Sequence, residues 1–484
     1  MVILREHPWE EKGGLPSVLG NEGAGRGRGL DGWTENESWE AGIKRGDGPG
    51  IAIDIGTTTV VAYLWDFSRR EVLRAISQEN CQTSMGADVM MRIMHAQRGK
   101  GEVLHQMLVD QFQRMLGELL GFWQEAGNTL LPDQEIPVSV VGNPTMCHFF
   151  LNQDVSGLAG APFRSAYEGN FFCTGEELGF QRGRKLRIQV LSGIAAHVGG
   201  DALAVLGVAE RRGMGGVTLM VDLGTNAEMI LANRGSLTCC STAAGPALEG
   251  KGIACGVRAK PGAVTGVKIA PKTGNIVLEY LSGAAPMGIT GTGLLELMEG
   301  LCRCGILTRE GYLLEREEAE KSNIHPKLSA RLVTGQGKRG FLLCGEDEAS
   351  RGNCCMGVGK EIILYQDDVR NVQLAKGAIL AGIQCLLYES GLSPEDVEEV
   401  LVAGALGNHL REEAVLRLGL FPRAFRGRIS LVGNSAGIGA VRMLAESGFA
   451  EAMERRAEEI AHVELAEMEV FKKNMMDGMA FREF

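Results

Sequence analysis

Two aspartates, Asp54 and Asp222, each end an apolar segment and lead into a glycine turn that carries hydroxyl or amide side chains. A carboxylate at this position suits a hydrated cation, and a glycine lets backbone N–H groups approach phosphate oxygens without a Cβ atom in the way. Either turn alone would also fit an ordinary tight turn between two strands. Together they favour ATP with Mg2+, with Asp54 and Asp222 as catalytic residues that hold the metal. The candidate phosphate ligands are Gly56, Thr57, Thr58, Thr59, Gly224, Thr225 and Asn226.

The similarity between the two regions continues beyond the turns. Each hairpin is followed by a third strand-like run, at 71–77 and at 236–241. Each half then offers two units in which a strand leads through a glycine loop into a helix. Helix N-termini after such loops direct unpaired N–H groups and positive dipole ends toward whatever lies between the halves. The pattern therefore predicts a duplicated α/β fold with an anion site between its two halves.

The order of these motifs resembles that of the actin, Hsp70 and sugar-kinase ATPase superfamily. The resemblance implies a duplicated ribonuclease-H-like α/β fold with two lobes around a nucleotide cleft. The first lobe is expected at 50–210 and the second at 211–484, with insertions at about 305–360. Residues 1–49 are rich in glycine and charge and have few regularly spaced apolar positions, so a flexible leader is expected there.

A narrower resemblance covers residues from about 50 to the last residue. These residues look like the ATPase domain of the reductive activators of corrinoid-dependent enzymes. The family implies that ATP use accompanies the return of an oxidised corrinoid protein from cobalt(II) to cobalt(I), which makes a corrinoid protein the implied partner. The motifs that carry the resemblance are Gly86–Arg92, Val198–Asp201, Asp222–Glu228, Ser241–Gly250, Val372–Lys376 and Val402–Asn408.

Several further residues are candidates for the site. Asp201 either positions the attacking water, as a catalytic residue, or caps its helix, and both readings stay open. Gly404 resembles the position where adenine stacks against bare backbone. Lys376 either reaches ribose or phosphate from its helix or is a solvated surface lysine. The other nucleotide-binding candidates are Asn143, Gly245, Glu249, Gly291, Gly293, Gly407 and Asn408.

The cysteines bear on the source of electrons. Members of the resembling family usually carry an amino-terminal plant-type ferredoxin domain, but the first cysteine here is Cys81, after Asp54. The 12 cysteines include no C-x2-C pair. We therefore expect no iron–sulfur cluster in this chain and a separate ferredoxin-like electron donor. The alternative to buried, reduced thiols is a cluster site drawn from Cys302, Cys304, Cys344, Cys354 and Cys355.

Composition narrows the class of protein. The net charge is −11 at pH 7, which argues against nucleic acid as a partner. No apolar run reaches membrane-spanning length and the first residues lack the layout of a signal peptide, so we expect a cytoplasmic protein without membrane contact. A homodimer is one oligomeric state that the sequence leaves open.

Two other functions fit the same scaffold. One is a small-molecule kinase that transfers the γ-phosphoryl group to a hydroxyl or carboxylate acceptor. The other is a noncatalytic binding switch that responds to ATP. ADP with a phosphorylated small molecule would select the kinase, ADP with free phosphate the activator, and tight ATP binding without turnover the switch.

Overall fold

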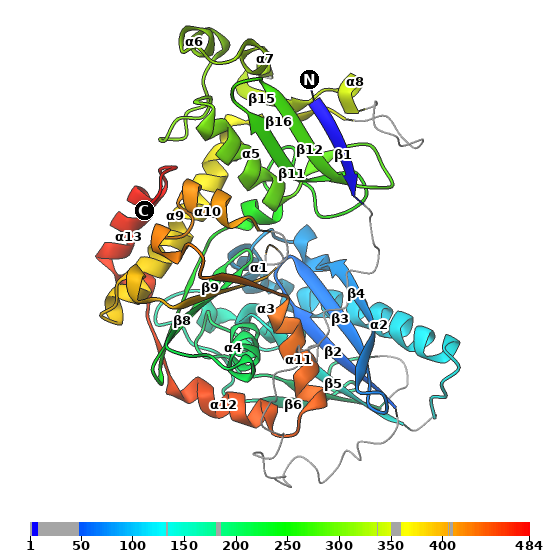
Figure 1. The fold of residues 1–484 in the computed structure, drawn as a ribbon. Coiled ribbons are helices and arrows are strands. Elements are labelled where there is room, and N and C mark those ends of the chain that lie inside the picture. The colour runs from blue at the N-terminus through cyan, green and yellow to red at the C-terminus, as the bar shows by residue number, and fades with distance from the viewer. Residues whose placement is uncertain are drawn as a thin grey trace, which may run out of the picture.

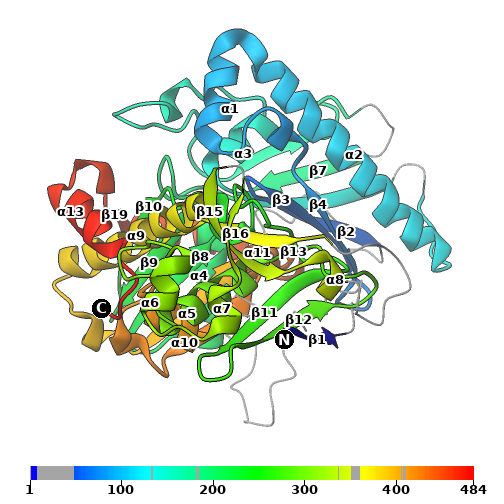
Figure 2. The same cartoon turned by 90° about the horizontal axis from the view of Figure 1, so that it is seen from above.

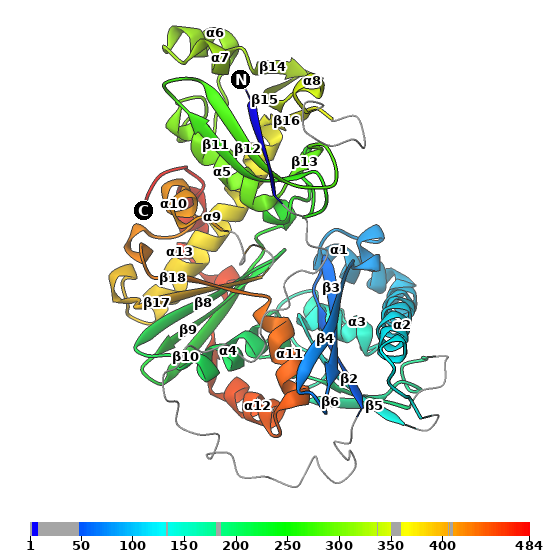
Figure 3. The same ribbon diagram turned by 45° about the vertical axis from the view of Figure 1, so that its right-hand side comes forward.

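The computed structural model describes residues 2–7, 48–131, 134–180, 185–335, 337–349, 360–404, 406 and 410–484. Two six-stranded sheets dominate it and lie on opposite sides of a layer of helices (Figure 3). We call residues 48–212 the first half and residues 217–484 the second half, because each contains one of these sheets.

The first half is built on the sheet β4-β3-β2-β5-β7-β6. Its first three strands form an antiparallel meander, and two parallel strands follow on the other side of β2. Almost every residue of β2 and β5 is buried, which explains their continuous apolar runs. The bounds are β2 (Pro49–Ile55), β3 (Thr59–Asp66), β4 (Glu71–Glu79), β5 (Glu135–Gly142), β6 (Phe171–Thr174) and β7 (Lys185–Val190).

The second half repeats this arrangement in the sheet β18-β17-β8-β9-β10-β19. Its meander and its two parallel strands have the same order as those of the first half, which confirms the duplicated α/β fold. The sheets differ in the added edge strand, which lies beside the last parallel strand in the first half and beside the third meander strand in the second. The bounds are β8 (Val217–Leu223), β9 (Ala227–Asn233), β10 (Ser236–Thr242), β17 (Glu399–Gly404), β18 (Ile429–Gly433) and β19 (Ile460–His462).

Two helices join the halves. α4 (Gly200–Arg212) and α11 (Ser435–Ala445) pack against each other between the sheets, as Figure 3 shows. A Cβ atom on Gly439 would lie 2.5 Å from the Cβ atom of Ala204, so the missing side chain permits this close approach. The hydroxyl of Ser139, in β5, donates to the carbonyl oxygen of Ala440 at 2.6 Å. One buried cluster therefore contains side chains from both halves.

The remaining helices flank the two large sheets or extend beyond them (Figure 1). In the first half, α2 packs on the sheet along an apolar stripe, and its side chains Leu108 and Phe112 are buried. The helices of the first half, besides α4, are α1 (Val89–His95), α2 (Gly101–Glu125) and α3 (Pro144–Phe150). Those of the second half, besides α11, are α5 (Gly291–Arg303), α6 (Arg316–Lys321), α7 (Pro326–Ser329), α8 (Glu346–Ala349), α9 (Gln366–Glu389), α10 (Glu412–Leu418), α12 (Phe449–Glu459) and α13 (Glu469–Gly478).

Two smaller sheets extend the second half. One has the order β1-β12-β11-β13 and packs against α5, and the other is β14-β15-β16 (Figure 2). Although 305–360 was expected to hold insertions, buried side chains such as Leu328 and Phe341 join its segment to the main core. The bounds are β1 (Val2–His7), β11 (Ala263–Ala270), β12 (Asn275–Leu281), β13 (Gly288–Ile289), β14 (Leu332–Gly335), β15 (Lys338–Cys344) and β16 (Ile362–Tyr365).

The strand β1 corrects the expectation of a flexible leader over 1–49. Residues 2–7 pair in parallel with β12, beginning with Val2 opposite Ile276. Val2 and Leu4 pack against the core, whereas Ile3 is exposed. Buried and exposed side chains therefore alternate along β1, as in a short edge strand, but this pattern covers too few residues to stand out in the sequence. Residues 8–47 lie outside the described residues. In the part of the chain that the structure describes, no helix is long and apolar enough to cross a membrane.

Candidate nucleotide site

The two predicted phosphate hairpins face each other and touch. The hydroxyl oxygens of Thr58 and Thr225 are 3.0 Å apart and both side chains are buried. Each turn is closed by the N–H of its glycine: the N–H of Gly56 donates to the carbonyl oxygen of Thr59, three residues on, and the N–H of Gly224 donates to that of Asn226, two residues on, both at 2.9 Å. A Cβ atom on Gly56 would lie 2.7 Å from that Thr59 oxygen, so this turn requires glycine.

The loops after the hairpins support them. Asn143, between β5 and α3, accepts from the Met146 N–H and donates to the Thr57 hydroxyl at 2.9 Å. The N–H of Gly245 donates to the Thr225 carbonyl oxygen at 2.7 Å. Glu249, in the short helix η4 (Pro246–Glu249), accepts from the Thr225 hydroxyl at 2.8 Å. The structure thus brings Asn143, Gly245 and Glu249 to the hairpins, whereas their role in nucleotide binding stays a prediction.

Five mutually interacting carboxyl groups lie near the place where the hairpins meet: those of Asp54, Asp201, Asp222, Glu228 and Glu249. Burial raises the pKa of Asp54 to about 7, with a contribution from the charge of Asp201. Burial also raises the pKa of Asp222 to about 8, with contributions from Asp201, Asp54 and Glu249. The pKa of Glu249 is raised by its burial as well. Such a group of repelling carboxylates is stabilised in its ionised form by a cation, so the donor set fits a hydrated magnesium ion.

The prediction for Asp54 and Asp222 is a hydrated magnesium ion, which is held through its water molecules rather than by direct ligands. Within the described residues, no group of three or more His, Cys, Asp or Glu side chains is arranged as direct metal ligands. Asp54 and Asp222 as magnesium holders therefore stay a prediction, supported by the electrostatics of the carboxyl groups rather than by ligand convergence. Cys354 and Cys355 of the alternative cysteine group lie outside the described residues.

Asp201 lies in the first turn of α4 and is buried. The N-cap residue of this helix is Gly199, so the capping interpretation of Asp201 is not what the structure shows. Its Oδ1 accepts from the N–H of Ala202 at 2.8 Å. Burial raises the pKa of Asp201 to about 6, in the range where a carboxylate can accept a proton from water near neutral pH.

These pKa shifts predict a stability that depends on pH. Because Asp201, Asp54 and Asp222 have raised pKa values in the folded protein, their contribution to stability is full at low pH and is lost as pH rises through about 6 to 8. We expect the Tm of the metal-free protein to fall between about pH 5 and pH 8. Mg-ATP should reduce this fall because a cation stabilises the ionised carboxylates.

Thermal unfolding across this pH range, with a chelator or with Mg-ATP, measures the effect. Asp222→Asn should flatten the profile of the metal-free protein. Asp154→Asn is the matched control, because hydrogen bonds from Ser156 lower the pKa of exposed Asp154, which stays ionised throughout the range. The same slope in wild type and Asp222→Asn would contradict the assignment.

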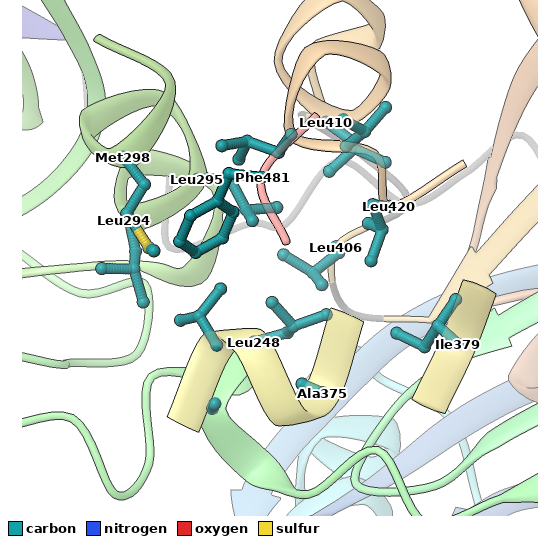
Figure 4. Close-up of a cluster of buried hydrophobic side chains, with 14 of the residues drawn as sticks. Leu248, Leu294, Leu295, Met298, Ala375, Ile379, Leu406, Leu410, Leu420 and Phe481 are labelled. Atoms are coloured by element: carbon teal, nitrogen blue, oxygen red, sulfur yellow. The ribbon is translucent and has the colours of Figure 1, made fainter. Parts of the chain in front are cut away.

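Only part of the segment predicted to bind adenosine, residues 402–404 and 406, belongs to the described residues. Gly404 ends β17 with φ of 90°, and a Cβ atom there would lie 2.4 Å from the Leu223 carbonyl oxygen and 2.7 Å from Asp222 Oδ1. Gly404 therefore adjoins the carboxyl cluster itself. Gly407 and Asn408 lie outside the described residues. Leu406 is buried in an apolar cluster between α5 and α9 (Figure 4).

The glycines at the start of α5 permit close packing beside this loop. A Cβ atom on Gly291 would lie 1.6 Å from the Leu248 carbonyl oxygen and 3.2 Å from the Leu406 side chain. One on Gly293 would lie 2.7 Å from the Val264 carbonyl oxygen. Gly291 therefore adjoins both η4 and the adenosine loop, whereas Gly293 packs against β11. Neither contact tests binding of a nucleotide, so this role stays a prediction for both.

Lys376 does not lie with the other candidates. Its side chain is buried and its Nζ donates to the carbonyl oxygens of Gly478 and of Ala480, the latter at 2.7 Å. Burial and the charge of Arg482 lower its pKa to about 7. The assignment of Lys376 to ribose or phosphate is therefore wrong, and so is the alternative of a solvated surface lysine. Its partners follow it by about a hundred residues, which local pattern could not reveal.

Lys376→Met should lower thermal stability without changing the KM for ATP. The change leaves two carbonyl oxygens without their donor, at about 1–3 kcal/mol for each one that stays buried, and removes no nucleotide contact. Thermal unfolding and steady-state ATPase kinetics measure the two quantities. Lys338→Met is the control, because it removes only an exposed ion pair with Asp367 and should change Tm little. A raised KM at unchanged Tm would return Lys376 to the nucleotide.

Sequence reasoning missed four residues at the site. Glu228 belongs to the carboxyl cluster, and its pKa is raised by burial and by Asp201 and Asp222. Asn434 caps α11, because its side chain accepts a hydrogen bond from the Gly437 N–H. The same side chain donates to the Tyr63 hydroxyl at 3.1 Å and forms a hydrogen bond with the Asp54 carboxyl group. Its position after Gly433 matches that of Asn143 after Gly142, and this repeated pair was the available signal. The other two missed residues are Arg92 and Arg258.

A separate cavity in the first half is not part of this site. It lies between the sheet and α2 and is lined by apolar side chains, including Ile51, Phe112 and Leu186. Such a lining offers phosphate no hydrogen-bond donors or positive charge. The site at the hairpins is therefore defined by its polar groups and by their contacts across the two halves.

Comparison with known proteins identifies relatives over most of the chain. A family model described as the C-terminal domain of RACo, the ASKHA domain, matches residues 216–483, and one described as the RACo middle region matches residues 49–211. The chain is 33% identical over 439 residues to the corrinoid activation enzyme RamQ of Eubacterium limosum, covering 89% of this chain and 70% of that protein.

Two further relatives are also named for the reduction or activation of corrinoid proteins. A Co(II) methylated amine-specific corrinoid protein reductase of Methanosarcina barkeri is 27% identical over 419 residues, covering 80% of this chain and 68% of that protein. A solved structure of a reductive activator for a corrinoid, iron–sulfur protein superimposes with a TM-score of 0.79 at 29% identity, covering 90% of this chain and 66% of that one.

Proposed function

Because the chain belongs to the RACo family of reductive activators of corrinoid proteins, we propose that it couples ATP turnover to the return of a corrinoid protein from cobalt(II) to cobalt(I). The observation that carries the ATP part is the carboxyl cluster of Asp54, Asp201 and Asp222 at the point where the hydroxyls of Thr58 and Thr225 meet. The names of the relatives support the corrinoid part.

The carboxyl groups take different roles in this proposal. Asp54 and Asp222 would hold a magnesium ion, which would offset the charge of the phosphates. Asp201 positions water with its carboxylate and accepts a proton there, since its pKa of about 6 leaves it mostly ionised near neutral pH once a cation is nearby. The N–H groups of the two glycine turns bind phosphate oxygens.

ATP assists an unfavourable electron transfer through a change in affinity. It can do so only if the ATP-bound protein binds one redox or ligation state of the corrinoid partner better than the other. Each tenfold difference between the two affinities supplies about 1.4 kcal/mol. The contact between Thr58 and Thr225 joins the two halves at the nucleotide, so occupation of the site can alter how the halves are set relative to each other.

We propose that the electrons come from a separate ferredoxin-like protein. The chain contains no C-x2-C pair, and its described cysteines 302, 304 and 344 all have thiol pKa values raised by burial. A buried thiol with a raised pKa is a poor source of the thiolate that iron requires. The redox centre would then be contributed by the donor, and this chain would supply the ATP-dependent step.

The reaction products test the proposal. The purified chain is mixed with Mg-ATP, with or without a cobalt(II) corrinoid protein, and ADP, free phosphate and phosphorylated small molecules are quantified. We expect ADP and free phosphate in equal amounts, at a rate that the corrinoid protein increases. A phosphorylated small molecule would establish a kinase instead, and tight ATP binding without any turnover would establish a binding switch.

A further inference from the structure

The side chain of Arg258 crosses from the second half to the first phosphate hairpin. Arg258 lies between η4 and β11, and its Nη2 donates to the Thr58 carbonyl oxygen at 2.6 Å. The same guanidinium group is 3.9 Å from the carboxylate of Glu79, which also pairs with Lys251. Arg258 thus makes two kinds of contact with the first half: a hydrogen bond to the hairpin and a long ion pair beside it.

A second arginine holds the neighbouring peptide from within the first half. Arg92, in α1, is fully buried, and its Nη2 donates to the Thr57 carbonyl oxygen at 2.6 Å. Its Nε donates to the Gly86 carbonyl oxygen at 3.0 Å, and its Nη1 contacts Gln82 and Met146. All of these partners are uncharged. Burial lowers the pKa of Arg92, whereas the nearby charge of Asp88 favours its ionised form without a hydrogen bond between the two side chains being among these contacts.

Two consecutive carbonyl groups of the hairpin are therefore each bound by a guanidinium group, one from each half. In a trans peptide the N–H points opposite to the C=O, so the N–H groups of Thr58 and Thr59 point away from the two arginines. A charged donor on the carbonyl oxygen also polarises the peptide, which strengthens its N–H as a donor. These N–H groups belong to the turn assigned to phosphate.

We propose that Arg258 is a positioning residue through which closure of the two halves orders the first phosphate hairpin for ATP turnover. The proposal rests on the proposed ATPase function. If the halves separate, Arg258 leaves Thr58, whereas Arg92 keeps its contacts because it belongs to the same half as the hairpin. The Thr58 carbonyl oxygen would then retain only the Asn80 N–H, at 2.9 Å. Full alignment of the hairpin is thereby confined to the closed arrangement.

Steady-state kinetics of Arg258→Ala test the proposal. We expect kcat to fall about tenfold or more, with a smaller change in the KM for ATP and a Tm close to that of wild type, because a misplaced hairpin affects the reaction more than folding. Guanidinium ion at about 20 mM, far below the molar concentrations that unfold proteins, should restore part of kcat. Arg258→Lys should recover less, since an ammonium group lacks the reach and the planar donors of arginine.

Glu79→Gln is the matched variant. It weakens the ion pairs of Glu79 with Lys251 and Arg258 but keeps the hydrogen bond from Arg258 to Thr58. We expect its kcat to stay within about twofold of wild type, in line with the small worth of exposed ion pairs. Equal losses in Glu79→Gln and Arg258→Ala, without rescue by guanidinium, would overturn the proposal, because the ion pairs alone would then explain the effect.

A measurement without turnover separates this proposal from the ATPase function. Amide hydrogen exchange of a peptide that covers residues 55–60 should be faster in nucleotide-free Arg258→Ala than in wild type and in Glu79→Gln. A wild-type chain that fails to hydrolyse ATP would refute the proposed function, but the exchange comparison would still report whether Arg258 orders the hairpin. Identical exchange in all three proteins would refute the role of Arg258.

Discussion

Asp54→Asn and Asp222→Asn should each lower ATP turnover by at least about 10²-fold, roughly 2.7 kcal/mol or more in the barrier, while folding is preserved. Both carboxyl groups are assigned to the metal and its water, and asparagine cannot supply their negative charge. Their raised pKa values show that burial and mutual repulsion disfavour the charges when no cation is present. Removal of one charge should therefore leave the metal-free fold as stable as wild type or more stable.

Turnover and Tm of each variant are measured on the same preparation. Asp154→Asn serves again as the control, because Asp154 is exposed and its hydrogen bonds are to Ser156. Wild-type turnover in both Asp54→Asn and Asp222→Asn would place the reaction elsewhere. A large loss of Tm together with turnover would instead mean that the carboxyl groups support the fold.

Gly404→Ala should weaken ATP binding by about tenfold or more. The residue has φ of 90°, and the added Cβ atom would lie 2.4 Å from the Leu223 carbonyl oxygen and 2.7 Å from Asp222 Oδ1. Contacts this short force a shift of the backbone or of the Asp222 carboxylate, in addition to backbone strain of about 1–3 kcal/mol. Because Asp222 must move, binding of inorganic tripolyphosphate should weaken as well.

Gly391→Ala is a matched control for Gly404→Ala. Gly391 also has a positive φ, of 65°, but a Cβ atom there would meet nothing within 4 Å. Gly391→Ala therefore introduces the backbone strain without a contact to Asp222. This variant should lower Tm without changing the affinity for ATP. Calorimetric titration with ATP and with tripolyphosphate measures binding. Equal affinities in the two variants would mean that Gly404 lies away from the phosphates.

The sequence predicted those parts of the fold and site that depend on neighbouring residues. The two hairpins could be recognised because each strand, turn and second strand lies within a short segment, and their repetition predicted the matching sheets. The strand β1 escaped prediction because only Val2 and Leu4 carry its apolar pattern, and its partner β12 lies far along the chain.

The site residues show the same division. Asn143 and Asn434 both follow a glycine at the end of a strand, so the repeat could have indicated the second once the first was assigned. Arg258 and Lys376 carry no such signal. Their hydrogen-bond partners lie 200 and 102 residues away in the chain, and only the folded structure shows that Arg258 reaches a hairpin while Lys376 does not.

Formation of cobalt(I) is the most direct test of the central claim. The purified chain, a cobalt(II) corrinoid protein, a reduced ferredoxin-like donor and Mg-ATP are combined without oxygen, and the cobalt(I) absorption band is followed. We expect the band to grow with ATP but not with ADP, and we expect omission of the chain or its replacement by Asp222→Asn to abolish the growth. Cobalt(I) formation at the same rate with and without ATP would contradict the central claim.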